Sequence, residues 1–197
     1  AAMAIAAGFG MSTLSLIPLQ IASVGIVASI LCIIYVKATG RGNPQSALMG
    51  GLYVSAILTV IGTYFIIKHH NVSFEGHDVM GPFWATIAGV LSGVIIGFTS
   101  EYYTSSKYKP VKNLADESQS GPAITVTGGL ALGMASNAVP VIVLAIALIV
   151  SHDLAGIYGV ALASLGMLAT TGMVVAVDSY GPIADNAGGI AEMAHLD

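Results

Sequence analysis

Three carboxylates near the end of the sequence have the residue types and the spacing of a metal site. Asp178, Asp185 and Glu192 are seven residues apart, and no lysine or arginine lies near them. Seven residues turn an α-helix through about 700°, so the three side chains would share one helix face. Carboxylate oxygens suit Mg²⁺, which keeps several waters and takes few protein ligands. The pattern favours a site for Mg²⁺ with a phosphate, although a helix end that faces water would show the same pattern.

The spacing also limits what these carboxylates do together. Asp178 and Asp185 would lie about 10.5 Å apart along the helix axis. Because that separation is too large for one ion, the two residues would mark two levels of one cavity. Ionisable groups next to hydrocarbon are costly and usually mark an ion path or a ligand site. This helix cannot complete a metal site alone, so other helices must contribute ligands.

The composition shows what kind of protein must position these acids. Of 197 residues, 55% are hydrophobic and 8% are charged, whereas soluble domains have about 25% charged residues. The mean hydropathy is +0.85, and the 24 glycines suit closely packed membrane helices. Six Lys and Arg against ten Asp and Glu provide no basic surface for a phosphate backbone, so no nucleic-acid partner is expected.

Five stretches without a charged residue predict five transmembrane helices in an all-α, polytopic bundle. Each is roughly 20 residues or longer, the length that crosses about 30 Å of hydrocarbon. One transmembrane domain over residues 1–197 is predicted, with helices at about 14–36, 47–67, 81–104, 121–151 and 154–192. The fourth helix is expected to kink at Pro140, which removes one helical hydrogen bond. Residues 1–10 are too short to span, and they are expected to be the tail of a preceding helix in a larger protein.

The cations predict the orientation in the membrane. Five of the six lysines and arginines lie in alternate loops: Lys37, Arg41, Lys107, Lys109 and Lys112. Only Lys68 lies in the loop on the other side. Since cytoplasmic loops carry the excess of Lys and Arg, those two loops and the C-terminal residues are predicted to be cytoplasmic. The turn at His152 and Asp153 is predicted to be external.

Small residues recur every four positions in two of the predicted helices. They are Gly89, Gly93, Gly97, Ala155, Gly159 and Ala163. Such spacing lets helix backbones approach closely in lipid. Ordinary close packing is the expected role, and a dimer seam or a conformational hinge is the alternative.

Two stretches of sequence resemble signatures of the membrane-bound, ion-pumping pyrophosphatases. The first is DSYGPIADNAGGIAEM at 178–193, and the second is GFTSEYYTS at 97–105, followed by YKPV at 108–111. GGLALGM at 128–134 and YGVA at 158–161 also match. The resemblance covers nearly the whole chain.

This resemblance implies a homodimeric fold of roughly sixteen transmembrane helices that hydrolyses pyrophosphate at a cytoplasmic Mg²⁺ site and exports H⁺, Na⁺ or both. It implies that Asp185 binds Mg²⁺ with pyrophosphate, and that Asp178, Asn186 and Glu192 belong to the same substrate and metal site. The family determinants of K⁺ dependence and of the pumped ion lie outside this sequence, so K⁺ as a cofactor stays open.

The main acidic motifs of that family, its water-activating aspartates and its phosphate-binding lysines also lie outside these residues. No catalytic residue is therefore assigned here, and the 197-residue chain alone is expected to be inactive. Two other classes stay open. One is a secondary transporter that uses Asp178 and Asn137, and the other is a non-catalytic membrane subunit in which the small-residue stripes are the functional part.

Overall fold

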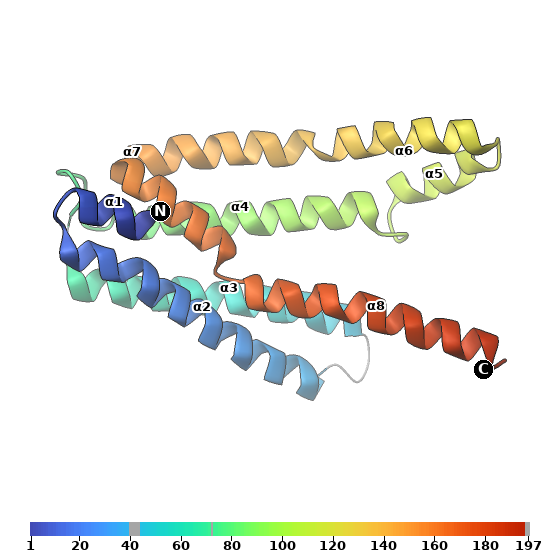
Figure 1. Cartoon of the computed structure of the whole chain (residues 1–197), viewed down its shortest axis with the longest axis horizontal. Helices are drawn as coiled ribbons and strands as arrows, with labels where there is room; N and C mark the ends of the chain where they lie inside the picture. Colours follow the sequence, from blue (N-terminus) through green and yellow to red (C-terminus); the bar gives the residue numbers. More distant parts are fainter. Residues whose placement is uncertain (40–43, 72, 196–197) are drawn as a thin grey trace.

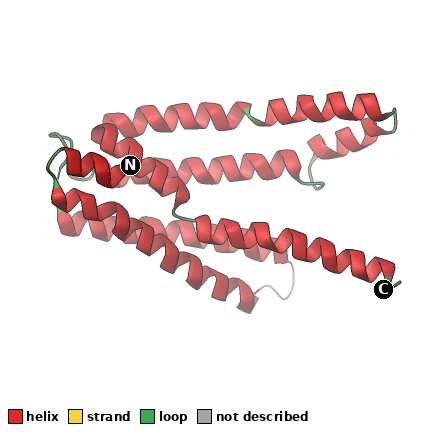
Figure 2. Ribbon diagram, in the orientation of Figure 1, coloured by secondary structure: helices red, strands yellow, loops and turns green. Residues whose placement is uncertain are grey.

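The computed structural model describes residues 1–39, 44–71 and 73–195, and every regular element among them is a helix (Figure 1, Figure 2). The helices are α1 (Ala2–Gly8), α2 (Ser12–Thr39), α3 (Pro44–His70), α4 (Gly81–Thr104), α5 (Lys109–Ser118), α6 (Pro122–Ser136), α7 (Ala138–Leu168) and α8 (Thr171–Met193). Arg41, one of the predicted cytoplasmic cations, lies outside the described residues.

Four helical runs in the described part of the chain are long and apolar enough to cross a membrane. They are Ser12–Ala38, Ala47–His70, Gly81–Ser118 and Pro122–Met193. The last run has 72 residues, and it turns back on itself within α7, so that it supplies two antiparallel legs (Figure 1). The chain is therefore a helical membrane protein, as its composition predicted.

The turn within α7 lies at Ala155 and Gly156, slightly later than the predicted turn at His152 and Asp153. Gly156 has φ 58° and ψ −152°, and Ala155 has φ −153° and ψ 31°. A glycine adopts a positive φ without the steric penalty that a Cβ would add. His152 and Asp153 are helical, because the first backbone position that reverses the chain easily is this glycine.

Two further interruptions divide helices that the sequence predicted as continuous. The predicted helix at 121–151 is broken at Asn137, three residues before Pro140, whose missing N–H removes the bond to the carbonyl of Ser136. The predicted helix at 154–192 is broken between Leu168 and Thr171. There the Ala169 carbonyl lies against Gly25 of α2, so this interruption coincides with the crossing of two backbones.

Helices α4 and α7 form the closest interface of the bundle. Gly89 lies directly against the backbone of Ala163, and a Cβ added at Gly166 would lie 2.5 Å from the Thr86 carbonyl oxygen. Gly81 packs in the same way against Leu154. Close packing of the small residues is thus confirmed for Gly89, whereas a Cβ at Gly97 would meet open space.

Aromatic residues close the end of the bundle that contains α1. Tyr158 is completely buried, and its hydroxyl donates a hydrogen bond of 2.7 Å to the Leu14 carbonyl of α2. Its ring stacks on Phe74, with 5.2 Å between the centroids, and Phe74 meets Phe9 edge-on at 5.1 Å. At the opposite end, α5 and α6 have no buried residue among those described, and α8 projects beyond its neighbours (Figure 1).

Candidate functional site

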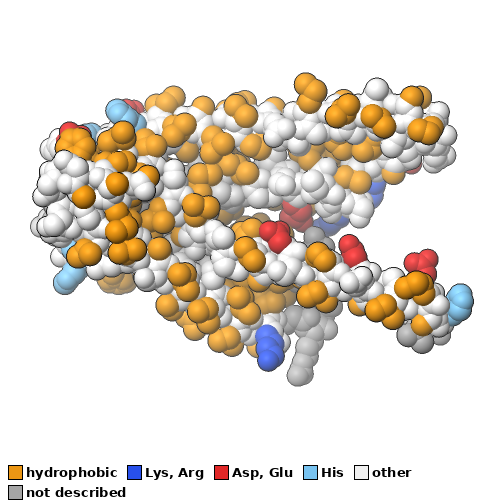
Figure 3. All heavy atoms as spheres, in the orientation of Figure 1, with side chains coloured by type: hydrophobic (Ala, Val, Ile, Leu, Met, Phe, Trp, Pro, Cys, Tyr) orange, Lys and Arg blue, Asp and Glu red, His pale blue; other side chains and the backbone are white. Residues whose placement is uncertain are grey.

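The acidic signature lies on α8, which is one helix from Thr171 to Met193. Asp178, Asp185 and Glu192 are all exposed on it. Figure 3 shows carboxylates along α8, and hydrophobic side chains are spread over much of the visible face. Pro182 lies inside the helix and has no N–H for the carbonyl four residues earlier, which belongs to Asp178. The backbone oxygen of Asp178 therefore receives no hydrogen bond from position 182. Asp178 has this oxygen as well as the two oxygens of its carboxylate.

A pocket of about 310 Å³ lies where α8 meets α3 and α4. Its lining is mostly apolar, with a few hydroxyls and two carboxylates. The residues are Met49, Leu52, Tyr53, Val94, Gly97, Phe98, Ser100, Glu101, Thr104, Val174 and Asp178. An apolar cavity with a few convergent polar groups is the usual form of a small-ligand or ion site.

The two carboxylates of this pocket come from different helices. Glu101 is half-buried near the C-terminal end of α4, and Asp178 is exposed on α8. The Thr104 hydroxyl donates a hydrogen bond of 2.8 Å to the Ser100 carbonyl. Gly97 has no side chain to fill the space beside Glu101 and Asp178, which accounts for the open space at this member of the glycine stripe.

The donor set is suited to a hard cation but is not a complete metal site. Carboxylate and hydroxyl oxygens are the ligands that Mg²⁺ and other hard cations prefer. Within the part of the chain that the structure describes, no group of three or more His, Cys, Asp or Glu side chains is placed to hold a metal ion. Two carboxylates fit Mg²⁺ that keeps most of its waters or binds a phosphate, so additional donors must come from elsewhere.

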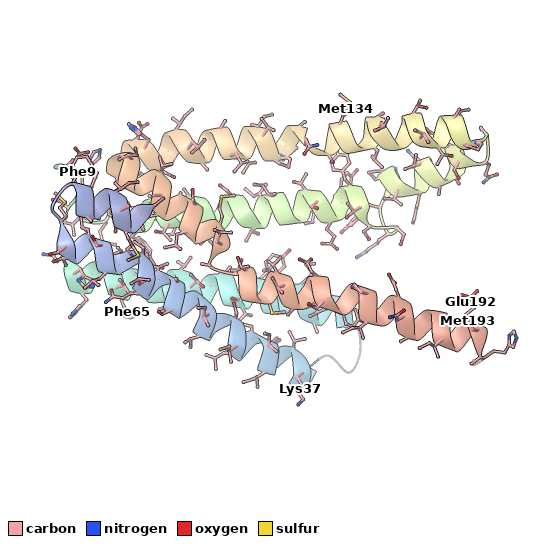
Figure 4. All side chains as sticks on the ribbon, in the orientation of Figure 1. Phe9, Lys37, Phe65, Met134, Glu192 and Met193 are labelled. Carbon is pink, nitrogen blue, oxygen red and sulfur yellow. The ribbon has the colours of Figure 1, made fainter. Side chains whose placement is uncertain are left out.

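The other predicted site residues are separated from this pocket. Of the described residues of α8, Val174 and Asp178 line it, whereas Asp185, Asn186 and Glu192 are exposed further along the helix. Glu192 lies near the free end of α8 (Figure 4). The three acids on this face of α8 thus lie at successive positions along the helix. Of these three, only Asp178 lines a pocket together with residues of other helices.

Glu101 is the residue that sequence reasoning did not select. The signal that would have found it is its position inside GFTSEYYTS, four residues after Gly97 and therefore on the same face of the helix. No charge pattern pointed to it, because its partner Asp178 is 77 residues away in the sequence.

Asn137, the residue proposed for a transporter, does not contribute to this pocket. It is exposed at the junction of α6 and α7, and its side-chain amide donates a hydrogen bond of 2.9 Å to the Gly133 carbonyl. That bond satisfies a carbonyl at the end of α6. The structure therefore gives Asn137 a capping contact at a helix break.

The fold and this site together define a polytopic helical membrane protein with a row of acids on α8 and a pocket between α3, α4 and α8. The sequence profile of the family described as inorganic H⁺ pyrophosphatase matches residues 1–197. The chain belongs to that family.

Curated relatives of the chain are of two kinds. It is 44% identical over 188 residues to a "K(+)-stimulated pyrophosphate-energized sodium pump" of Thermotoga maritima, covering 91% of this chain and 26% of the relative. It is 41% identical over 192 residues to a "K(+)-insensitive pyrophosphate-energized proton pump" of Methanosarcina mazei, covering 92% of this chain and 27% of the relative. The chain thus spans about a quarter of the length of these relatives.

Proposed function

We propose that these 197 residues form part of a pump that hydrolyses pyrophosphate and exports H⁺ or Na⁺. The observation that carries the proposal is the family match over residues 1–197, which includes the acidic face of α8. The relatives named as sodium and proton pumps are almost equally similar, at 44% and 41% identity. Overall similarity therefore supports pumping but does not select the ion, and the same holds for K⁺ as a cofactor.

In this proposal, α8 connects the substrate to the ion path. Asp185, with Asn186 and Glu192, would hold Mg²⁺ and pyrophosphate at the cytoplasmic end, where these side chains are exposed and form no ion pair with a described residue. When bound, Mg²⁺ would neutralise the phosphate charge and polarise the phosphoryl oxygens. Asp178 and Glu101 would receive the pumped cation one level deeper, in the pocket between α3, α4 and α8. The functional unit would be a homodimer surrounded by membrane lipid.

The test uses inside-out vesicles that contain the whole pump. Mg²⁺-dependent phosphate release from pyrophosphate is measured for the wild type, for Asp185→Asn and for the matched control Asp116→Asn, whose exposed carboxylate lies on α5. Loss of a direct ligand is expected to lower hydrolysis by about 100-fold or more, with little change in the control. The 197-residue chain alone is expected to release no phosphate.

Three outcomes would contradict the proposal in different ways. Hydrolysis that survives Asp185→Asn would reduce this residue to a structural role. Hydrolysis by the 197-residue chain alone would show that the site is complete within it. No hydrolysis by the wild-type pump at any K⁺ or Na⁺ concentration would reject the pyrophosphatase activity itself.

The pocket of Glu101 and Asp178 also supports a second candidate, a secondary transporter without hydrolysis. Two carboxylates from different helices beside an apolar cavity are a common way to bind a coupling ion within a membrane. The transporter would show gradient-driven flux in vesicles that lack pyrophosphate, and that flux would fall in Asp178→Asn. The pump would show flux only when pyrophosphate is present.

A further inference from the structure

The C-terminal end of α4, the segment that follows it and the start of α5 contain a group of basic and aromatic residues that the proposed pump site does not use. We name it the lysine–tyrosine cluster, and it consists of Tyr102, Tyr103, Lys107, Tyr108, Lys109 and Lys112. The three lysines are exposed. Among the described residues none of them forms an ion pair with a carboxylate. Three positive charges therefore lie close together at one end of the bundle without a partner of opposite charge in this part of the chain.

Ring contacts connect Lys107 with the three tyrosines of the cluster, and the other two lysines follow in the first turn of α5. The Lys107 ammonium lies 5.7 Å from the centre of the Tyr108 ring. The Tyr108 ring is 5.3 Å from that of Tyr102, which in turn is 5.2 Å from that of Tyr103. Tyrosine is enriched where a membrane meets water, because its ring is apolar and its hydroxyl is polar. Lysine side chains near helix ends extend their charge to the same interface.

The orientation of α5 presents this basic surface outward. Val111 and Leu114 are half-buried, and Leu114 lies next to Gly128 of α6. Lys109 and Lys112 are on the opposite, exposed side of the helix. The packing partners of α5 are α4 and α6, and α5 forms no comparable interface with the acidic helix α8 within the described residues. The acids of α8 therefore do not account for the lysines.

The order of charges along α5 is also informative. Lys109 begins the helix, whereas Asp116 and Glu117 lie in its last turn. The helix dipole favours the reverse order, with acids first and bases last. The arrangement therefore does not stabilise the helix. It puts Lys109 next to Tyr108 and about 10 Å along the axis from Asp116. Lys112 is one turn, about 6 Å, from Asp116.

We propose that the lysine–tyrosine cluster binds anionic phospholipid headgroups of the cytoplasmic leaflet and holds α5 at the membrane surface. The cluster begins at Tyr102, two residues after the uncharged stretch 81–100 of α4, which is long enough to span. Juxtamembrane lysines are attracted to acidic headgroups, and tyrosines at the end of a spanning helix favour the same headgroup region. The proposal uses the predicted orientation of the chain but not pyrophosphate hydrolysis, so it fails or succeeds separately from the proposed function.

The experiment measures lipid binding by the whole pump in detergent. Native mass spectrometry reports the retention of phosphatidylglycerol in the presence of excess phosphatidylcholine. The variants are the triple change Lys107→Gln, Lys109→Gln, Lys112→Gln, the same three positions changed to Arg, and the control Lys37→Gln with Lys68→Gln. Each lysine near an anionic surface contributes roughly fivefold, so the triple Gln variant is expected to lose about 100-fold in phosphatidylglycerol affinity. The triple Arg variant and the control are expected to keep it.

The proposal is overturned if the triple Gln variant retains its preference for phosphatidylglycerol. It is also overturned if soluble pyrophosphate displaces phosphatidylglycerol from the wild type as completely as the triple Gln change does, because the cluster would then bind a free polyanion. An unchanged melting temperature separates loss of the headgroup site from misfolding. If the Gln variant fails to fold, the triple Arg variant decides the matter: loss of phosphatidylglycerol binding in that folded, fully charged protein rejects the proposal.

Discussion

The two ends of this bundle are built from similar apolar helices but are held together in different ways. At the packed end, which comprises α1, the start of α2, the 73–80 loop, the start of α4 and residues 151–166, side chains such as Leu14, Phe74 and Tyr158 are completely buried. At the open end, which comprises α5, α6 and α8 from Asp178 onward, α5 and α6 have no buried residue among those described. The acids of α8 lie at the open end and are exposed.

This difference separates stability from chemistry along the length of the helices. The packed end depends on contact between backbones, for which glycine is needed, and on hydrogen bonds that are satisfied inside the protein. The open end keeps carboxylate oxygens accessible to ions and ligands, and a closely packed environment would prevent that access. We therefore expect substitutions at the packed end to lower stability, and substitutions at the open end to lower function while the fold persists.

The largest effect on stability is expected from Gly89→Ala in α4. Its Cβ would lie 2.6 Å from the carbonyl carbon of Ala163, so α4 and α7 must separate, at a cost of about 3 kcal/mol. The matched control is Gly133→Ala in α6, where a Cβ meets open space and the better helix former adds up to about 1 kcal/mol. Denaturation midpoints of the whole protein in detergent measure both changes, and equal midpoints would remove the distinction between the two ends.

The carboxylate pair is expected to produce the next largest effect, and on function rather than on stability. Glu101 and Asp178 line one pocket. Each of the variants Glu101→Gln and Asp178→Asn is therefore expected to raise the activation free energy of pyrophosphate-driven ion transport by about 2 kcal/mol, which lowers the rate. A double-mutant cycle should show a coupling of about 0.5–3 kcal/mol, as found for residues that share a site.

The control for this cycle pairs Glu101→Gln with Asp116→Asn, since Asp116 lies on α5 and does not line the pocket. Transport in vesicles provides the rates, and the melting temperature shows whether each variant is folded. Additive effects of Glu101→Gln and Asp178→Asn would mean that the two carboxylates act independently, and the pocket would then not be one site.

A smaller loss of stability is expected for Tyr158→Phe at the packed end. It removes the donor of the 2.7 Å hydrogen bond to the Leu14 carbonyl and leaves a buried acceptor unsatisfied, at a cost of about 1–2 kcal/mol. Tyr180→Phe on α8 is the control, because this hydroxyl is exposed and makes no hydrogen bond within the described residues. Thermal unfolding in detergent should distinguish the two variants, and a larger loss for Tyr180→Phe would reverse the comparison.

The class of protein was readable from the sequence, and so was Asp178 as one of the two carboxylates that line the pocket. The uncharged stretches predicted a helical membrane protein, because a spanning segment must satisfy its backbone internally and exclude charge. The close approach of Gly89 was predicted from the four-residue spacing of small residues. The motif DSYGPIADNAGGIAEM marked Asp178, Asp185, Asn186 and Glu192, whose roles stay predictions until the variants are measured.

The tertiary structure decided where the helices break and which acids meet. The turn at Gly156 uses the backbone freedom of a glycine, but 24 glycines in the sequence do not show which of them turns the chain. The interruption between α7 and α8 lies where Ala169 meets Gly25 of α2, a contact that leaves no local sequence signal. Glu101 and Asp178 line the same pocket because α3 packs against both α4 and α8. A sequence determines which residues lie on one face of one helix, because helix periodicity is local. Only the packing of helices distant in the chain brings two such faces together.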